Sequence, residues 1–336
     1  MAESVKIATR ESFGKALCEL AKTHSDIVVL DADLSAATKT DIFAKEYPDK
    51  FIDCGIAECN MIGVAAGLAA AGKVPFAASF AMFATGRAYE QIRNTVAYPA
   101  LNVKIAGSHA GISVGEDGAT HQCLEDIALM RTIPGMVILN PADHYEMVAA
   151  TKAAYEHNGP VYIRLGRLAI DSFNDPDNYK FEIGKGITLH EGNDVTVIAT
   201  GLVVYESLKA VKALEAEGIN VRLINMHTIK PIDKDIIIKA AKETGRIITV
   251  EEHNVIGGLG EAVTSAVCEE YPVPVTRIGI NDTYGHSGPA VGLIAEYGLD
   301  SVSLAKRFKE IIGKRNRQIQ NAQVHLNILE HTQDIR

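Results

Sequence analysis

Several residue types that would point to particular functions are scarce in this chain. Its 336 residues contain no Trp, and aromatic residues make up only 6%. Lys and Arg number 33 against 42 Asp and Glu, so the formal net charge is -9. An acidic chain without a dense basic stripe and interleaved aromatic residues has no electrostatic drive toward phosphate backbones or anionic membranes. We therefore expect neither nucleic acid nor a membrane as a partner.

Cysteine is also scarce, and its spacing argues against a disulfide framework. The five cysteines are odd in number, form no C-x-x-C pair and fall in segments expected to be buried: Cys18, Cys54, Cys59, Cys123 and Cys268. Reduced thiols are the default for such a pattern. The first residues lack a basic start followed by an apolar core, so no secretory signal is predicted. We expect a cytoplasmic protein.

No apolar run is long enough to span a membrane. The longest candidate, residues 61–86, is interrupted by Lys73 and Pro75 after about a dozen residues, short of the roughly 20 that a transmembrane helix needs. This segment is therefore predicted to be a buried helix followed by a buried strand.

Short apolar, β-branched runs alternate with segments of helical period along most of the chain. In the first half, strands are predicted at 27–30, 51–54, 74–78, 103–107, 136–140 and 161–164, and helices at 12–23, 58–71, 87–97, 122–132 and 143–157. After a polar, turn-rich stretch at 171–185, strands follow at 195–199, 221–225, 247–250 and 275–278, and helices at 204–217, 233–244, 260–270 and 301–312. This alternation is typical of parallel α/β architecture.

The pattern predicts an α/β protein with two doubly wound, mostly parallel-sheet domains. The first domain covers residues 1–178 and the second, smaller domain covers residues 188–315, with the polar stretch as the boundary. Residues 316–336 are rich in Asn and Gln and form a tail of unknown role.

The loop after residues 103–107 is the richest in chemically active side chains. It gathers His109, Ser113, Glu116, Asp117 and His121 among glycines. Ligands of open parallel sheets bind where loops leave the carboxyl ends of strands, which favours a functional loop here. The alternative is a glycine-rich turn with a solvated acid pair and structural histidines.

The same loop contains two misleading patterns. Residues 111–115 fit the G-x-S-x-G motif of hydrolases, and Asp117 and His121 follow in the order of a catalytic triad. However, no strand leads directly into the serine and no helix follows it, and the triad would be confined to nine residues. Asp117 and Asn140 imitate a magnesium pattern but lie in separate loops without a neighbouring carboxylate. We predict neither serine hydrolysis nor a metal site on this chain.

Two further segments allow two interpretations each. Glu58 begins a predicted helix of small apolar residues, where a carboxylate can simply complement the helix N-terminus. If a partner subunit covered it, desolvation would raise its pKa toward general acid or base duty. Phe76, Phe80 and Phe83 near a strand end are either core residues or a platform for a cofactor ring.

Taken together, these loops resemble those of transketolase. The segments that carry the resemblance include ATRESFGKAL (8–17), FIDCGIAECNM (51–61), SFAMFATGRAYEQIR (79–93), GSHAGISVGEDGATHQ (107–122) and VEEHNVIGGLGEAV (250–263). They occur in the family's order and match its pyrimidine-binding and C-terminal domains. The family's amino-terminal domain, with its Gly-Asp-Gly…Asn magnesium motif, has no match. The chain thus resembles the C-terminal subunit of a split transketolase.

This resemblance implies thiamine diphosphate as the cofactor. It also implies transfer of a two-carbon ketol unit from a ketose to an aldose, as in the pentose phosphate pathway. Glu58 would hydrogen-bond N1′ of the aminopyrimidine and act as a catalytic acid and base through it. Phe80 and Phe83 would pack against that ring, and Asp33 would lie near the thiazolium.

The resemblance also implies contacts to the substrate. His109, Asp117 and His121 would meet the sugar hydroxyls and aldehyde, with both histidines taking part in catalysis. Arg10 and Arg167 would hold the sugar phosphate, because a guanidinium suits bidentate phosphate contacts.

A partner chain is implied because no diphosphate-binding domain is matched. The diphosphate and its Mg²⁺ or Ca²⁺ would be bound mainly by a separate N-terminal subunit, in an α2β2 assembly. On this expectation the isolated chain is inactive.

The sequence departs from the family pattern at two positions. Cys59 replaces the Gln that commonly follows the catalytic Glu, and Ala37 stands where the family often has a phosphate-contacting Ser. Either Ser35 or Thr38 compensates for Ala37, or the substrate is an unusual or unphosphorylated sugar. The segment after Phe83 is also about one residue longer than in the animal enzymes.

Two other thiamine-diphosphate enzymes share the two-domain plan: deoxyxylulose-phosphate synthases and the beta subunits of 2-oxo acid dehydrogenases. The stretch GEDGATHQ (115–122) favours the transketolase branch. A non-catalytic scaffold subunit is a further alternative, against which the presence of Glu58 together with both histidines argues.

Overall fold

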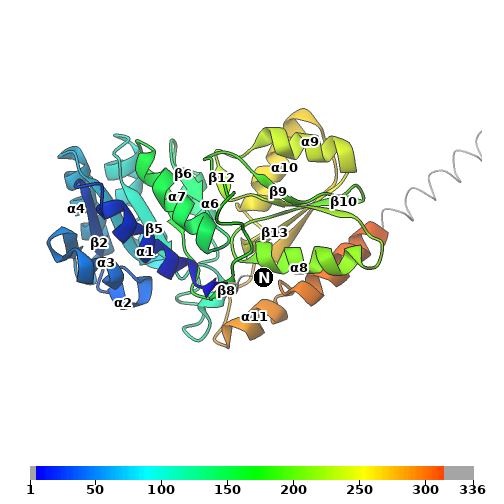
Figure 1. The fold of residues 1–336 in the computed structure, drawn as a ribbon, viewed down its shortest axis with the longest axis horizontal. Coiled ribbons are helices and arrows are strands. Elements are labelled where there is room, and N and C mark those ends of the chain that lie inside the picture. Colours follow the sequence, from blue (N-terminus) through cyan, green and yellow to red (C-terminus); the bar gives the residue numbers. More distant parts are fainter. Residues whose placement is uncertain (1–4, 314–336) are drawn as a thin grey trace, which may run out of the picture.

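The computed structural model describes residues 5–313, which form two α/β units lying side by side (Figure 1). The predicted tail at 316–336 lies outside the described residues. Within residues 5–313 no helix is both long enough and apolar enough to cross a membrane.

The first unit is built on a seven-stranded sheet. Its strands are β2 (Ile27–Asp31), β3 (Phe51–Asp53), β4 (Val74–Phe80), β5 (Lys104–Ser108), β6 (Val137–Leu139), β7 (Val161–Arg164) and β12 (Thr228–Lys230), in the order β12-β6-β7-β5-β4-β2-β3. All neighbours are parallel except β12, which is antiparallel to β6. Every residue of β4, β5 and β7 is buried, as expected for apolar strands covered on both faces.

Helices cover both faces of this sheet. Their bounds are α1 (Thr9–Ala21), α2 (Ser35–Thr38), α3 (Asp41–Glu46), α4 (Glu58–Ala70), α5 (Tyr89–Gln91), α6 (Asp126–Arg131) and α7 (His144–Glu156), with 3-10 turns η1 (Pro48–Lys50) and η4 (Ile112–Val114). The apolar sides of α1 and α7 form one core with the sheet, and those of α4 and α6 form the other. The helix predicted at 122–132 begins only at Asp126, because residues 115–122 remain in turns.

The segment after Phe80 differs most from its prediction. A helix was expected at 87–97, but helical structure already begins at Met82, and two stretches are π-helical: η2 (Met82–Arg87) and η3 (Ile92–Ala97). The backbone N–H of Ala88 donates to the carbonyl of Phe83 at 3.3 Å, five residues earlier. A π-turn accommodates an extra residue in a helix, so this segment does not follow the 3.6-residue period on which the prediction was based.

The second unit has a five-stranded sheet in the order β14-β13-β10-β11-β9. Its strands are β9 (Ile187–His190), β10 (Val195–Ala199), β11 (Val221–Asn225), β13 (Ile247–Asn254) and β14 (Val275–Ile280). Its helices are α8 (Val203–Glu215), α9 (Lys234–Thr244), α10 (Leu259–Glu270) and α11 (Ala290–Glu296), and residues 301–313 are also helical. The sequence pattern missed the antiparallel edge strand β9, which is only half-buried.

The two units are joined by more than the linker. Strand β12 follows β11 of the second unit in the sequence but completes the edge of the first sheet beside β6. Strands β1 (Lys6–Ile7) and β8 (Ile170–Asp171) pair and fasten the start of the chain to the linker. The sequence pattern predicted none of these three short strands. The α/β fold with two mostly parallel sheets is confirmed.

Candidate active site

The predicted site residues lie at the carboxyl ends of the strands of the first sheet. Phe80 is the last residue of β4, His109 follows β5, and Arg167 follows β7. Because these strands are parallel neighbours, their ends meet at one edge of the sheet.

Aromatic rings from two of these segments stack on one another. The rings of Phe80 and Phe83 lie 5.9 Å apart with an interplanar angle of 10°. His109 stacks on Phe80 with the ring centres 3.9 Å apart, and the ring centres of His121 and Phe83 lie 5.3 Å apart in a T-shaped arrangement. The histidines of the loop and the two phenylalanines therefore form one continuous group. Phe76, by contrast, is fully buried against Phe13 and is a core residue.

Glu58 is connected to this aromatic group through an arginine. It is the first residue of α4 and only 1% exposed, and its carboxylate accepts hydrogen bonds from Arg87 Nη1 at 2.6 Å and Ser79 Oγ at 3.3 Å. The same guanidinium lies 4.7 Å from the centre of the Phe83 ring. Sequence reasoning missed Arg87, because the π-helical turn that brings it to Glu58 is not visible in a helical periodicity.

His109 is held in a neutral state by its surroundings. Arg10 Nη1 lies 3.0 Å from its Nε2, and Ser108 Oγ lies 2.9 Å from its Nδ1. Since a guanidinium can only donate, Nε2 accepts, and Nδ1 carries the proton and donates to Ser108. Burial, together with the neighbouring positive charges, lowers the pKa of His109 to about 3. At neutral pH the imidazole therefore carries no charge, and Arg10 and Ser108 fix its orientation.

The two predicted arginines lie on the same side of the site. Arg10 Nη1 also donates to the carbonyl of Ala37 at 2.7 Å, and its buried Nε has no hydrogen-bond partner. Burial and the nearby Arg167 lower the pKa of Arg10. Arg167 pairs with Glu116 at 2.7 Å and donates to the carbonyl of Val114. The unpaired Nε and the mutual repulsion of the guanidiniums leave this side suited to an anion.

The remaining predicted residues are more open. Asp33 is exposed with φ 61°, and its backbone N–H donates to Asp53 Oδ1 at 3.1 Å. His121 is half-buried, with Nδ1 2.9 Å from Thr120 Oγ1. Asp117 is exposed and makes no side-chain hydrogen bond or ion pair within residues 5–313, so the structure does not bring it against His109 or the arginines.

The hydrolase-like motif does not form a nucleophile elbow. Ser113 is buried in the 3-10 turn η4, and its backbone N–H donates to Glu252 Oε1 of the second unit at 2.6 Å. Gly111 is needed here, because a Cβ at that position would lie 2.3 Å from the same carboxylate oxygen. The motif therefore anchors the loop to the second unit.

Comparison with known proteins decides the family. The family model "Transketolase, pyrimidine binding domain" matches residues 5–171, and "Transketolase, C-terminal domain" matches residues 184–304. The chain belongs to the transketolase family.

Individual relatives of this transketolase-family chain include both separate subunits and longer enzymes. A Methanocaldococcus jannaschii protein named as a transketolase C-terminal section is 50% identical, over 91% of this chain and 96% of that protein. A 6-deoxy-6-sulfo-D-fructose transketolase subunit from a Clostridium species is 43% identical over 91% of this chain and 95% of its own. Human transketolase is 39% identical over 92% of this chain but only 50% of its own length.

A solved structure supports the same assignment. A protein described as a split gene transketolase, inactive beta4 tetramer, superimposes with a TM-score of 0.85 at 50% sequence identity. The match covers 91% of this chain and 99% of that one. The transketolase fold of this chain therefore extends over both units.

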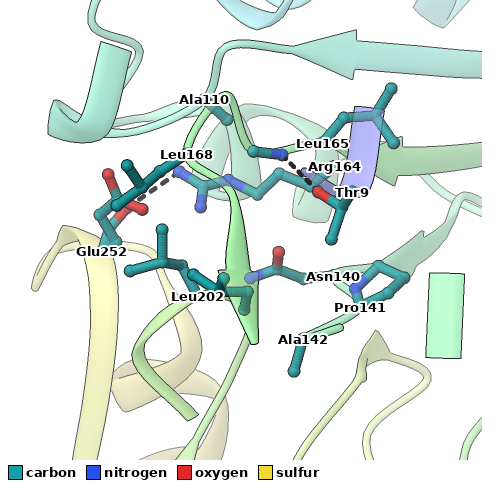
Figure 2. A pocket seen from close by; sticks show the side chains of 12 residues that line it. Thr9, Ala110, Asn140, Pro141, Ala142, Arg164, Leu165, Leu168, Leu202 and Glu252 are labelled. Carbon is teal, nitrogen blue, oxygen red and sulfur yellow. Dashed lines mark hydrogen bonds between the residues drawn. The ribbon is translucent and has the colours of Figure 1, made fainter. Parts of the chain in front are cut away.

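The transketolase chain also contains a buried charged group that sequence reasoning missed. At the junction of the two units, Asp126 accepts from Arg164 Nε at 2.8 Å and from the Tyr162 hydroxyl at 2.7 Å. Arg164 also donates to the backbone carbonyl of Glu252 at 2.9 Å, across the junction (Figure 2). Asp126 lies 38 positions before Arg164 in the sequence, and Glu252 lies 88 positions after Arg164.

The cavity in Figure 2 is too small to be the substrate site. Its lining comes from both units and includes Thr9, Asn140, Arg164, Leu202 and Glu252. Its volume is about 20 Å³, enough for about one water molecule. Within residues 5–313, no group of three or more His, Cys, Asp or Glu side chains is arranged to hold a metal ion.

Proposed function

We propose that this chain is the pyrimidine-side subunit of a split, thiamine-diphosphate-dependent transketolase. In this proposal it transfers a two-carbon ketol unit from a ketose donor to an aldose acceptor, in the cytoplasm. The main support is the continuous group of Glu58, Arg87, Phe83, Phe80 and His109, which combines a buried carboxylate with stacked aromatic rings. The relatives support the same chemistry.

The residues of this group fit the pyrimidine half of the cofactor. A flat heteroaromatic ring requires an apolar aromatic surface and a carboxylate that can hold a proton at a ring nitrogen. Phe80 and Phe83 offer the surface, and Glu58 offers the carboxylate. When bound, thiamine diphosphate supplies the nucleophilic carbon that accepts the ketol unit. Glu58 holds a proton at N1′, and Asp33 faces the thiazolium side.

The other residues act on the sugar. Neutral His109 keeps Nδ1–H on Ser108, and its Nε2 accepts from a substrate hydroxyl next to the reacting carbon when Arg10 turns to the anionic end of the sugar. His121 moves a proton at the same oxygens. Asp117, which is exposed in the isolated chain, contacts a sugar hydroxyl. Arg10 and Arg167 hold the anionic end of the sugar by charge-assisted hydrogen bonds.

The diphosphate and its Mg²⁺ or Ca²⁺ are proposed to be bound by a separate N-terminal subunit, in an α2β2 assembly. Support comes from the relatives whose whole length corresponds to this chain and from human transketolase, of which the match covers half. Glu58 lies at the start of α4, whose Gly63 and Gly67 are exposed and border open space, since a Cβ added at either would meet no atom within 4 Å. This face is therefore open to a closely packed partner.

The first test is reconstitution. The chain is mixed with a candidate N-terminal subunit, thiamine diphosphate and Mg²⁺, and ketol transfer is followed between a ketose phosphate and an aldose phosphate. Activity is expected only when both chains are present. Full activity of either chain alone would contradict the proposal, and turnover of a 2-oxo acid instead would favour the dehydrogenase-like alternative.

Glu58→Gln distinguishes a catalytic subunit from a scaffold. Removing a general acid and base is expected to lower kcat by about 10²- to 10⁴-fold. The matched control is Glu19→Gln, which changes an exposed carboxylate that pairs only with Lys22. If both variants kept full activity in the assembled enzyme, the scaffold alternative would be correct. Binding of thiamine diphosphate, measured by calorimetry, should also weaken in Glu58→Gln alone.

A further inference from the structure

Lys39 adds a third positive charge to the segment that contacts Arg10. It directly follows α2 and adopts φ 70°, a left-handed conformation unusual for a lysine. Its backbone is tightly packed against α1, because a Cβ on Gly14 would lie only 2.3 Å from the Lys39 carbonyl oxygen. The residue is therefore fixed two positions after Ala37, whose carbonyl binds Arg10.

The positive charges on this side outnumber the carboxylates that act on them. Burial first, and then Arg10, Arg167, His121 and Lys39 in that order, lower the pKa of His109, and Lys39 lies two positions after the carbonyl that binds Arg10. Within residues 5–313 the Lys39 ammonium has no ion pair or hydrogen bond, and Arg167 pairs with one carboxylate, Glu116. Three cations thus act on a neutral histidine, while Glu116 pairs with Arg167 and Glu11, whose charge also reaches Arg10, pairs with Lys15. Such a surplus is stabilised when an anion enters.

The neighbouring hydroxyl of Thr38 cannot serve this anion. Thr38 is fully buried, and its Oγ1 donates to Asp31 Oδ2 at 2.7 Å and lies 3.0 Å from Thr40 Oγ1. The expectation that Thr38 compensates for Ala37 is therefore wrong, because its hydroxyl is committed to a buried acid. Ser35 is partly exposed, and Lys39 is the charged donor on the same segment.

We propose that Lys39 is a specificity-determining residue that, together with Arg10 and Arg167, selects sugars ending in a tetrahedral oxyanion. A phosphate ester, with up to two negative charges, matches this surplus of positive charge better than a hydroxyl end does. A sulfonate shares the tetrahedral oxygens but carries one charge. The sugar part of this inference rests on the proposed function, whereas the anion site itself does not.

The first experiment needs neither cofactor nor partner. Inorganic phosphate is titrated into the full chain at constant ionic strength, and the ring signals of His109, identified with a His109→Gln variant, are followed by NMR. A saturable change is expected, and Lys39→Met should weaken the apparent affinity by about fivefold, the effect of one partly exposed charge. Lys39→Arg should restore most of it.

The control is Lys45→Met, which removes the same charge from an exposed lysine of α3 that pairs with Asp41. It should leave the affinity unchanged. Equal weakening in both variants would mean that only net charge matters and would overturn the proposal, as would the absence of any saturable change in the wild type. If Ser35→Ala weakened binding and Lys39→Met did not, the serine would be the determinant instead.

The second experiment uses the assembled two-subunit enzyme. With a phosphorylated aldose as acceptor, Lys39→Met should raise KM by about fivefold and keep kcat, while an unphosphorylated aldose of the same length should be unaffected. Equal losses with both acceptors would contradict the assignment. Sulfate is also titrated into the isolated chain, and its affinity is compared with that of phosphate. Tighter binding of sulfate would indicate a preference for sulfonates, and tighter binding of phosphate a preference for phosphate esters. If phosphate bound as expected but no ketol transfer occurred, the proposed function would fail and the anion site would remain.

Discussion

Two groups of charged residues in this chain are built in opposite ways. The junction cluster (Asp126, Tyr162, Arg164) is almost fully buried, and both groups that bind Asp126 reach it within 2.8 Å. The cation cluster (Arg10, Lys39, Arg167) is partly exposed, and the charge of each member lowers the pKa of His109. The first contains as much negative as positive charge, whereas the second has a surplus of positive charge.

This difference distinguishes charged residues that stabilise the fold from charged residues that are available to bind a ligand. A charge taken out of water must be paired and hydrogen-bonded, or the fold loses several kcal/mol. A surplus of one sign can persist only where water, or a ligand of opposite sign, reaches it. Burial alone would raise the pKa of Asp126, but Arg164 and its other partners lower it below its ordinary value, so the junction pair stays ionised. The cation cluster remains available for a ligand.

The largest effect is expected from breaking the junction cluster. Asp126→Ala leaves the buried Arg164 guanidinium without its carboxylate and should lower the free energy of unfolding by about 3–5 kcal/mol. Urea denaturation followed by circular dichroism measures this loss. As a control, Asp117→Ala removes an exposed carboxylate and should change stability by less than about 0.5 kcal/mol. If Asp126→Ala were as stable as the wild type, Asp126 would not be needed to stabilise the buried Arg164 guanidinium.

A second buried acid at the junction should make stability depend on pH. Glu146 on α7 accepts from Asn225 Nδ2 of the second unit at 2.7 Å, and burial raises its pKa to about 7 from an ordinary value near 4.5. Between these values the folded state binds more protons than the unfolded state. The contribution of Glu146 to stability should therefore fall as pH rises from about 4.5 to about 7, by up to roughly 1.4 kcal/mol per pH unit.

Glu146→Gln should reduce this slope. It should not abolish it, because burial raises the pKa of Glu251 to about 7 as well. Urea midpoints measured at several pH values provide the test. An unchanged slope in Glu146→Gln would show that this carboxyl group is ionised throughout.

The smallest effect on stability is expected from the cation cluster. Arg10→Met removes one of several like charges and should change the free energy of unfolding by no more than about 1 kcal/mol, despite two lost hydrogen bonds. The pKa of His109, now about 3, should rise toward its ordinary value, because Arg10 is the first of the positive charges that lower it. An NMR titration of the ring measures the shift. A destabilisation as large as that of Asp126→Ala would erase the distinction between the two clusters.

Local sequence is enough to specify the layers of the fold and the ends of the strands where chemistry occurs. Strands such as β4 and β5 are continuous apolar runs because they are buried on both faces. Such runs can be recognised from a few consecutive residues of the sequence. The loop with His109 and His121 and the carboxylate at the start of α4 were recognisable from local composition. The likeness to transketolase was carried by the same short segments.

Which of these side chains meet, and how their charges balance, depends on the tertiary structure. Strand β12 follows the second unit's β11 in the sequence but pairs in the first sheet. The π-helical turns bring Arg87 to Glu58. Arg164 pairs with Asp126, which lies 38 positions away in the sequence. Thr38 is committed to Asp31 while Lys39 is left without a partner in the described part of the chain. Such pairings depend on distances between segments that are remote in the sequence. Periodicity reports whether a residue is buried, but it does not report which charge lies opposite.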